Sequence, residues 1–94
     1  MKIDEMLRVL EETAAKKNIK VSYEAIGGEL GAGGLCKVKG EYRVIIDKRA
    51  TTGERVALVA GALAQFPLED VYLTPEVRDL LGRVRKPAGQ AVTT

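Results

Sequence analysis

The sequence predicts a small α+β domain: one antiparallel or mixed sheet of about three strands, a buried central helix and two flanking helices. Apolar residues repeat at helical spacing in the first 17 residues and alternate at strand spacing between residues 19 and 47. An uninterrupted run without polar side chains then extends from Val56 to Ala64. The chain has 94 residues, 46% hydrophobic and 30% charged, which suits a single globular domain.

The first helix is predicted over residues 4–17. Asp4 is its expected N-cap, and Asn18 is expected to end it in the left-handed conformation. One face of this helix is apolar and would be buried, formed by Ile3, Met6, Leu7, Leu10 and Ala14.

Three strands are predicted next. Residues 19–24 alternate apolar and polar side chains, whereas the glycine-rich residues 26–34 predict a loop. Residues 35–39 and 42–47 are predicted to form a hairpin that turns at Gly40. Because Ile45 and Ile46 are adjacent, we expect the last strand to be central in the sheet and covered on both faces.

Two more helices follow. Thr51 and Glu54 have the spacing of a capping box, and the apolar run behind them predicts a buried central helix over 54–66 that ends at Pro67. The Thr74-Pro75 pair predicts the start of a third helix, which Gly82 would cap. We therefore expect one domain over residues 1–82 and a disordered tail over 83–94.

The net positive charge of the chain comes from this tail. The net charge is +2, but Arg83, Arg85 and Lys86 lie beyond Gly82 without any acid, so residues 1–82 carry 12 basic and 13 acidic residues. The N-terminal segment carries acids where a signal peptide needs apolar residues, and Cys36 is the only cysteine. These observations predict a cytoplasmic protein without a membrane span.

The residue content argues against an enzyme. The chain has no histidine, which removes the usual centre of catalytic triads and zinc sites. Cys36 lacks a histidine to activate it and is expected to be a buried or half-buried structural residue. The glycine-rich loop lacks a phosphate-binding motif, and the acids at 69–79 lack a calcium-loop spacing. We therefore predict no catalytic residue, no cofactor and no metal site.

The segment GGLCKVKGEYRVIIDKRATTGERVALVAGALAQF, together with the preceding helix and strand, resembles small bacterial zinc-metallopeptidase domains of the ImmA/IrrE type. The resemblance covers about residues 5–66 and implies a similar fold. In that family an arginine-led helix carries His-Glu-x-x-His, and aligned on Arg55 those positions fall on Ala60, Gly61 and Ala64. The resemblance therefore implies a degenerate scaffold without the metal site, similar to a pseudoenzyme.

The predicted function is a non-catalytic binding or regulatory module that acts through a protein partner or as a homodimer. Its expected contact surface is the hairpin edge at 35–39, with Lys37, Lys39 and Arg43 as contact residues. The alternative is a nucleic-acid-binding accessory protein that uses the basic residues of 37–55 and of the tail at 83–86. A third hypothesis, an enzyme that uses Cys36 or carboxylates, has the least support from the residues.

Overall fold

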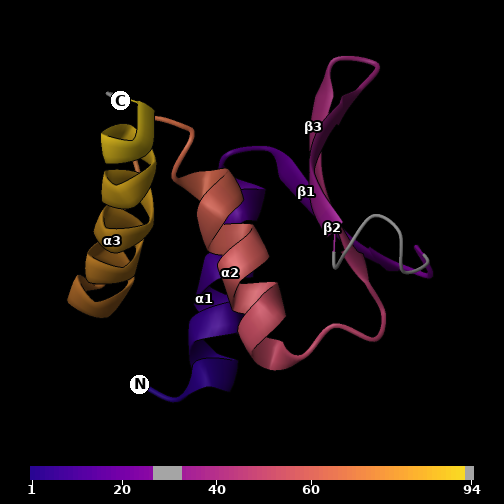
Figure 1. Ribbon diagram of the computed structural model, residues 1–94, viewed down its shortest axis with the longest axis horizontal. Coiled ribbons are helices and arrows are strands. Elements are labelled where there is room, and N and C mark those ends of the chain that lie inside the picture. Colours follow the sequence, from indigo (N-terminus) through magenta and orange to yellow (C-terminus); the bar gives the residue numbers. More distant parts are fainter. Residues whose placement is uncertain (27–32, 93–94) are drawn as a thin grey trace.

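The computed structural model describes residues 1–26 and 33–92, with side chains through residue 84. The described residues form three helices and one three-stranded sheet (Figure 1). Their bounds are α1 Ile3–Lys16, β1 Ile19–Glu24, β2 Gly33–Val38, β3 Glu41–Asp47, α2 Thr52–Leu63 and α3 Pro75–Val92. The predicted α+β class is confirmed.

The sheet is mixed and has the strand order β1-β3-β2. β1 runs parallel to β3, and β2 runs antiparallel to it. The hairpin between β2 and β3 turns through Lys39 and Gly40, which both have positive φ angles (52° and 83°), as the favoured two-residue hairpin turn requires. The prediction that β3 is the central strand is therefore confirmed.

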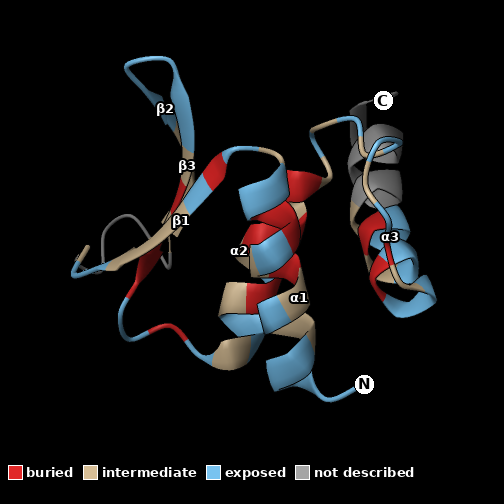
Figure 2. Ribbon diagram, turned by 180° about the vertical axis from the view of Figure 1, so that it is seen from behind, coloured by how far each residue is buried: buried red, intermediate tan, exposed pale blue. Residues whose placement is uncertain are grey.

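The elements form three layers. α1 and α2 pack together on one face of the sheet, and α3 lies on the far side of this helix pair (Figure 1). The core lies mainly between the first two layers, where Val44 and Ile46 of β3 meet Leu10 of α1 and Leu63 of α2, all fully buried. This arrangement leaves the other face of the sheet without a covering helix among the described residues (Figure 2).

The prediction that α2 is buried all round is not confirmed. Val59, Ala60 and Leu63 are buried, but Ala57 is exposed and Gly61 is half-buried. The apolar run includes alanine and glycine on the outer side of the helix, and such small residues expose little apolar surface to water. The expectation that β3 is covered on both faces fails similarly, because Ile45 on the second face is only half-buried.

The helix termini follow the sequence signals in part. The capping box of α2 is present: the Glu54 amide donates to Thr51 Oγ1 at 3.1 Å, and the Thr51 amide donates to Glu54 Oε1 at 2.8 Å. Asn18 has the predicted left-handed conformation, with φ 61°. Asp4 is not the N-cap of α1, however. The helix begins one residue earlier, so Lys2 occupies the cap without a side-chain hydrogen bond and Asp4 lies in the first turn.

α3 begins at Pro75 as predicted, with the Val77 amide donating to Thr74 Oγ1 at 3.4 Å. It does not end at Gly82, which has no left-handed φ angle, and the helical backbone continues to Val92. The helix therefore enters the segment predicted to be a disordered tail. Side chains beyond Val84 lie outside the described part of the chain, so the domain boundary at residue 82 stays a prediction.

Candidate protein-contact surface

The face of the sheet opposite the helices is a candidate contact surface. Strand alternation places ten residues on it, and we call it the uncovered face: Lys20, Ser22, Glu24, Gly34, Cys36, Val38, Glu41, Arg43, Ile45 and Asp47. Apolar groups reach solvent here, because Val38 is 41% exposed and Cys36 and Ile45 are half-buried. β2 is also an edge strand, so its outer backbone groups meet no other strand of the described sheet.

A hollow opens at one end of the uncovered face. Its volume is about 410 Å³, and its lining includes Glu24, Cys36 and Ile45. At its rim Gly33 crosses β3 closely, with φ 137°, so that a Cβ at this position would lie 1.9 Å from the Ile45 carbonyl oxygen. Only glycine fits there, which explains one glycine of the loop predicted at 26–34. Residues 27–32 of that loop lie outside the described residues.

Charged residues of the uncovered face lie in rows across the strands. The β1–β3 register pairs Lys20 with Arg43 at one level and Glu24 with Asp47 four residues further along. Ser22 and Ile45 lie between these two rows. Lys20 and Glu24 are exposed. The Ser22 hydroxyl donates a hydrogen bond to Glu24 Oε2 at 3.3 Å, so this carboxylate lies toward the middle of the face.

Asp47 is the least available charge of this face. It is 6% exposed, accepts a hydrogen bond from the Arg49 amide at 3.0 Å, and lies 3.5 Å from the Arg49 guanidinium. These contacts, the amide hydrogen bond first, lower the pKa of the Asp47 carboxyl below its usual range. Asp47 thus serves to fix the turn after β3.

The side chain of Arg43 makes few stabilising contacts with the described residues. Its Nη2 lies 3.4 Å from Glu41 Oε1, and its Nε is buried without a hydrogen-bond partner among the described residues. A buried donor without a partner costs about 1–3 kcal/mol. Arg43 is therefore poorly explained as a stabilising residue.

The three predicted contact residues do not form one cluster. Lys37 lies on the helix side of the sheet, with Nζ 5.1 Å from the centre of the Tyr42 ring, and that ring meets Phe66 edge to face at 4.9 Å. Lys39 lies in the turn rather than on a strand face. Arg43 lies on the uncovered face with Cys36. Strand alternation predicts the separation of Lys37 from Cys36, but the positive φ angle of Lys39 removes this lysine from the pattern.

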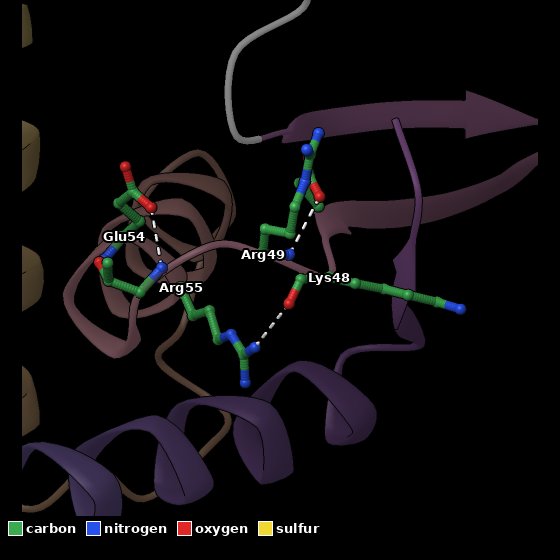
Figure 3. Close-up of polar contacts among 6 residues, drawn as sticks. Lys48, Arg49, Glu54 and Arg55 are labelled. Atoms are coloured by element: carbon green, nitrogen blue, oxygen red, sulfur yellow. Dashed lines mark hydrogen bonds and ion pairs between the residues drawn. The ribbon is translucent and has the colours of Figure 1, made fainter. Parts of the chain in front are cut away.

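A second cluster of polar residues lies on the covered side, at the start of α2. The Arg55 side chain donates to the carbonyl of Ala50 at 3.0 Å and to the carbonyl of Lys48 at 3.1 Å, and Figure 3 shows the hydrogen bond to Lys48. Its guanidinium lies 4.8 Å from the Tyr23 ring centre. The Tyr23 hydroxyl hydrogen bonds to Glu11 of α1. Burial, followed by this hydrogen bond, raises the pKa of Tyr23 to about 12. We call Arg55, Tyr23 and Glu11, with the carbonyls of Lys48 and Ala50, the Arg55 corner. These contacts join α1, β1 and the β3–α2 turn.

The positions aligned with the metallopeptidase motif have three different environments. Ala60 is fully buried in the core, and a Cβ at half-buried Gly61 would meet nothing within 4 Å. Ala64 lines a separate hollow of about 610 Å³ between the end of α2 and the start of α3. The three residues therefore do not line one shared groove.

The described part of the chain lacks the residue arrangements expected of a metal site or a membrane span. No group of three or more potential metal-ligating His, Cys, Asp or Glu side chains occurs there. Within those residues no helix combines the length and the apolar character needed to span a membrane. Among the acids at 69–79, Asp70 pairs with Lys17 at 2.9 Å and Glu76 pairs with the Met1 amino group at 2.8 Å. Two of these acids therefore tie α1 and the N-terminus to α3 and the segment before it.

Comparison with protein-family models, with curated proteins and with solved structures finds no match to this chain. The evidence on function therefore comes from the residues and their arrangement. The sequence hypothesis missed Lys20 and Glu24 on the uncovered face. Their opposite charges on the polar side of a predicted strand were the available signal, but their proximity to Arg43 depends on the β1–β3 pairing.

Proposed function

We propose that this chain is a non-catalytic binding module that acts through protein–protein contact, on a scaffold similar to a metallopeptidase domain without its metal site. Its contact surface is the uncovered face together with the free edge of β2. The observation that carries the proposal is that helices pack on one face of the sheet only, among the described residues, while the other face presents Cys36, Val38 and Ile45 to solvent. Half-exposed apolar groups within a polar frame are typical of protein contact sites.

The arrangement of basic residues gives less support to nucleic-acid binding. Lys37 packs over Tyr42, Arg55 hydrogen bonds to main-chain carbonyls, and Arg43 lies on the other face of the sheet from Lys37. A phosphate backbone is followed by several cations on one surface. Lys37, Arg43 and Arg55 are not gathered on one such surface.

The test uses the single cysteine of the chain. A benzophenone maleimide attached to Cys36 places a photo-reactive group on the uncovered face, and the labelled protein is irradiated in an extract of its own host. We expect discrete cross-linked protein adducts, identified by mass spectrometry. The matched control is the double variant Cys36→Ser/Ala57→Cys, which carries the same label on the exposed side of α2. Equal adducts from both positions, or none from Cys36, would refute the proposal.

A further inference from the structure

We infer that the partner of the uncovered face is a second copy of this chain, in a symmetric dimer whose two sheets pack face to face. This inference rests on the proposed function and names its partner. Its basis is the distribution of charge on β1 and β3, which makes this face complementary to itself in one orientation.

The register defines the complementarity. Lys20 and Arg43 form a basic row, Ser22 and Ile45 a neutral middle row, and Glu24 lies with Asp47 in the acidic row. A two-fold axis that lies between the sheets, perpendicular to the strands and level with Ser22, places each basic row over the acidic row of the other copy. Each interface of this kind is isologous, so every contact occurs twice.

The alternative two-fold axis, parallel to the strands, is disfavoured by the same charges. It would keep each row at its own level and place Arg43 of one copy opposite Arg43 of the other. Like charges brought together across an interface oppose association. The charge pattern therefore selects antiparallel strands across the interface, with β1 over β1.

Lys20 and Glu24 carry this argument, because both side chains are exposed. Asp47 is already paired with Arg49 and contributes less. Half-buried Ile45 lies in the neutral row and would supply the apolar centre, since packed sheets lie about 10 Å apart and their central side chains meet. The described strands place only ten residues on this face, so we expect a dissociation constant in the micromolar range.

The experiment is sedimentation equilibrium of the full chain from about 5 to 500 µM, with charge reversal on β1. Lys20→Glu and Glu24→Lys each replace two symmetric attractions by repulsions, and each should raise the dissociation constant about tenfold. The double variant Lys20→Glu/Glu24→Lys restores the pairs with exchanged signs and should dimerise like the natural chain. Lys16→Glu and Glu12→Lys, on the exposed side of α1, are matched controls and should leave dimerisation unchanged.

A short cross-link tests the position of the axis. In the variant Cys36→Ser/Ser22→Cys, the two introduced thiols would face each other at less than the sheet spacing of about 10 Å, within reach of a bismaleimide that spans about 10 Å. We expect covalent dimers from this variant, and far fewer from the natural chain, whose Cys36 lies away from the axis.

The outcomes separate the inference from the proposed function. A monomer at every concentration, or a dimer that is indifferent to the β1 reversals, overturns the inference. In either case, adducts of Cys36 with other proteins would still support the proposed function. A dimer that is lost in both single variants and restored in the double variant, with the Ser22→Cys cross-link, establishes the inference.

Discussion

The Arg55 corner and the uncovered face each contain an arginine, and the two arginines differ in how many contacts hold their side chains. Arg55 donates to two main-chain carbonyls and stacks on Tyr23, whereas Arg43 has a weak contact with Glu41 and a buried Nε without a partner in the described residues. The difference is that Arg55 joins elements of the fold, whereas Arg43 has no comparable structural partner among the described residues.

Truncation of one apolar residue on each side of the sheet tests how far the covered side and the uncovered face differ in stability. Leu63→Ala removes a fully buried side chain from the covered side and should lower the free energy of unfolding by about 3 kcal/mol. Val38→Ala, on the uncovered face, should change it by less than about 0.5 kcal/mol. Urea unfolding followed by circular dichroism measures both. A similar loss for the two variants would show that the uncovered face also belongs to the core.

Replacement of each arginine by methionine compares Arg55 and Arg43 directly. Arg55→Met keeps most of the stem length but removes two hydrogen bonds and the contact with Tyr23, so the free energy of unfolding should fall by about 2 kcal/mol. Arg43→Met removes a buried donor that has no partner among the described residues and should leave this free energy unchanged or slightly higher. The same urea experiment decides the point, and a larger loss for Arg43→Met would contradict the comparison.

The third and smallest effect is a pH dependence of the Arg55 corner. The pKa of Tyr23 is raised from 10 to about 12, so folding favours the neutral hydroxyl. This contribution is fully present below pH 10 and is lost as the pH rises through about 12. Because Tyr23 is partly exposed, we expect a loss of about 1–2 kcal/mol.

The Tyr23 effect is isolated by comparison with Tyr23→Phe, which cannot titrate. Urea midpoints of both proteins are measured between pH 9 and pH 12, where lysines also titrate in each. The difference between the two proteins should shrink toward pH 12. A constant difference over this range would show that the hydroxyl keeps no raised pKa.

Local signals in the sequence predicted much of the fold. The capping box at Thr51 and Glu54, the turn at Gly40 and the left-handed Asn18 each depend on a few adjacent residues, and each is present. The exposed side of α2 was predicted wrongly, because hydropathy does not separate a buried alanine from an exposed one such as Ala57. The end of α3 was missed because glycine permits, but does not impose, a left-handed cap.

The candidate surface was less predictable, because it depends on contacts between distant residues. Lys37, Lys39 and Arg43 are close in sequence, but strand alternation and the turn place them in three different environments. Lys20 and Arg43 are 23 positions apart in the chain, and the parallel β1–β3 pairing brings them to the same level. Nothing in the spacing of the residues specifies that pairing.

The strand order β1-β3-β2 also has a consequence for how the chain folds. The β2–β3 hairpin closes through a two-residue turn, whereas β1 must reach β3 across the intervening strand in the sequence. Local contacts form sooner than distant ones, since less chain entropy is lost in closing the loop. We therefore expect the hairpin to form early and the arrival of β1, with its charged rows, to complete the sheet. The uncovered face, which we propose as the contact surface, would then exist only once folding is finished.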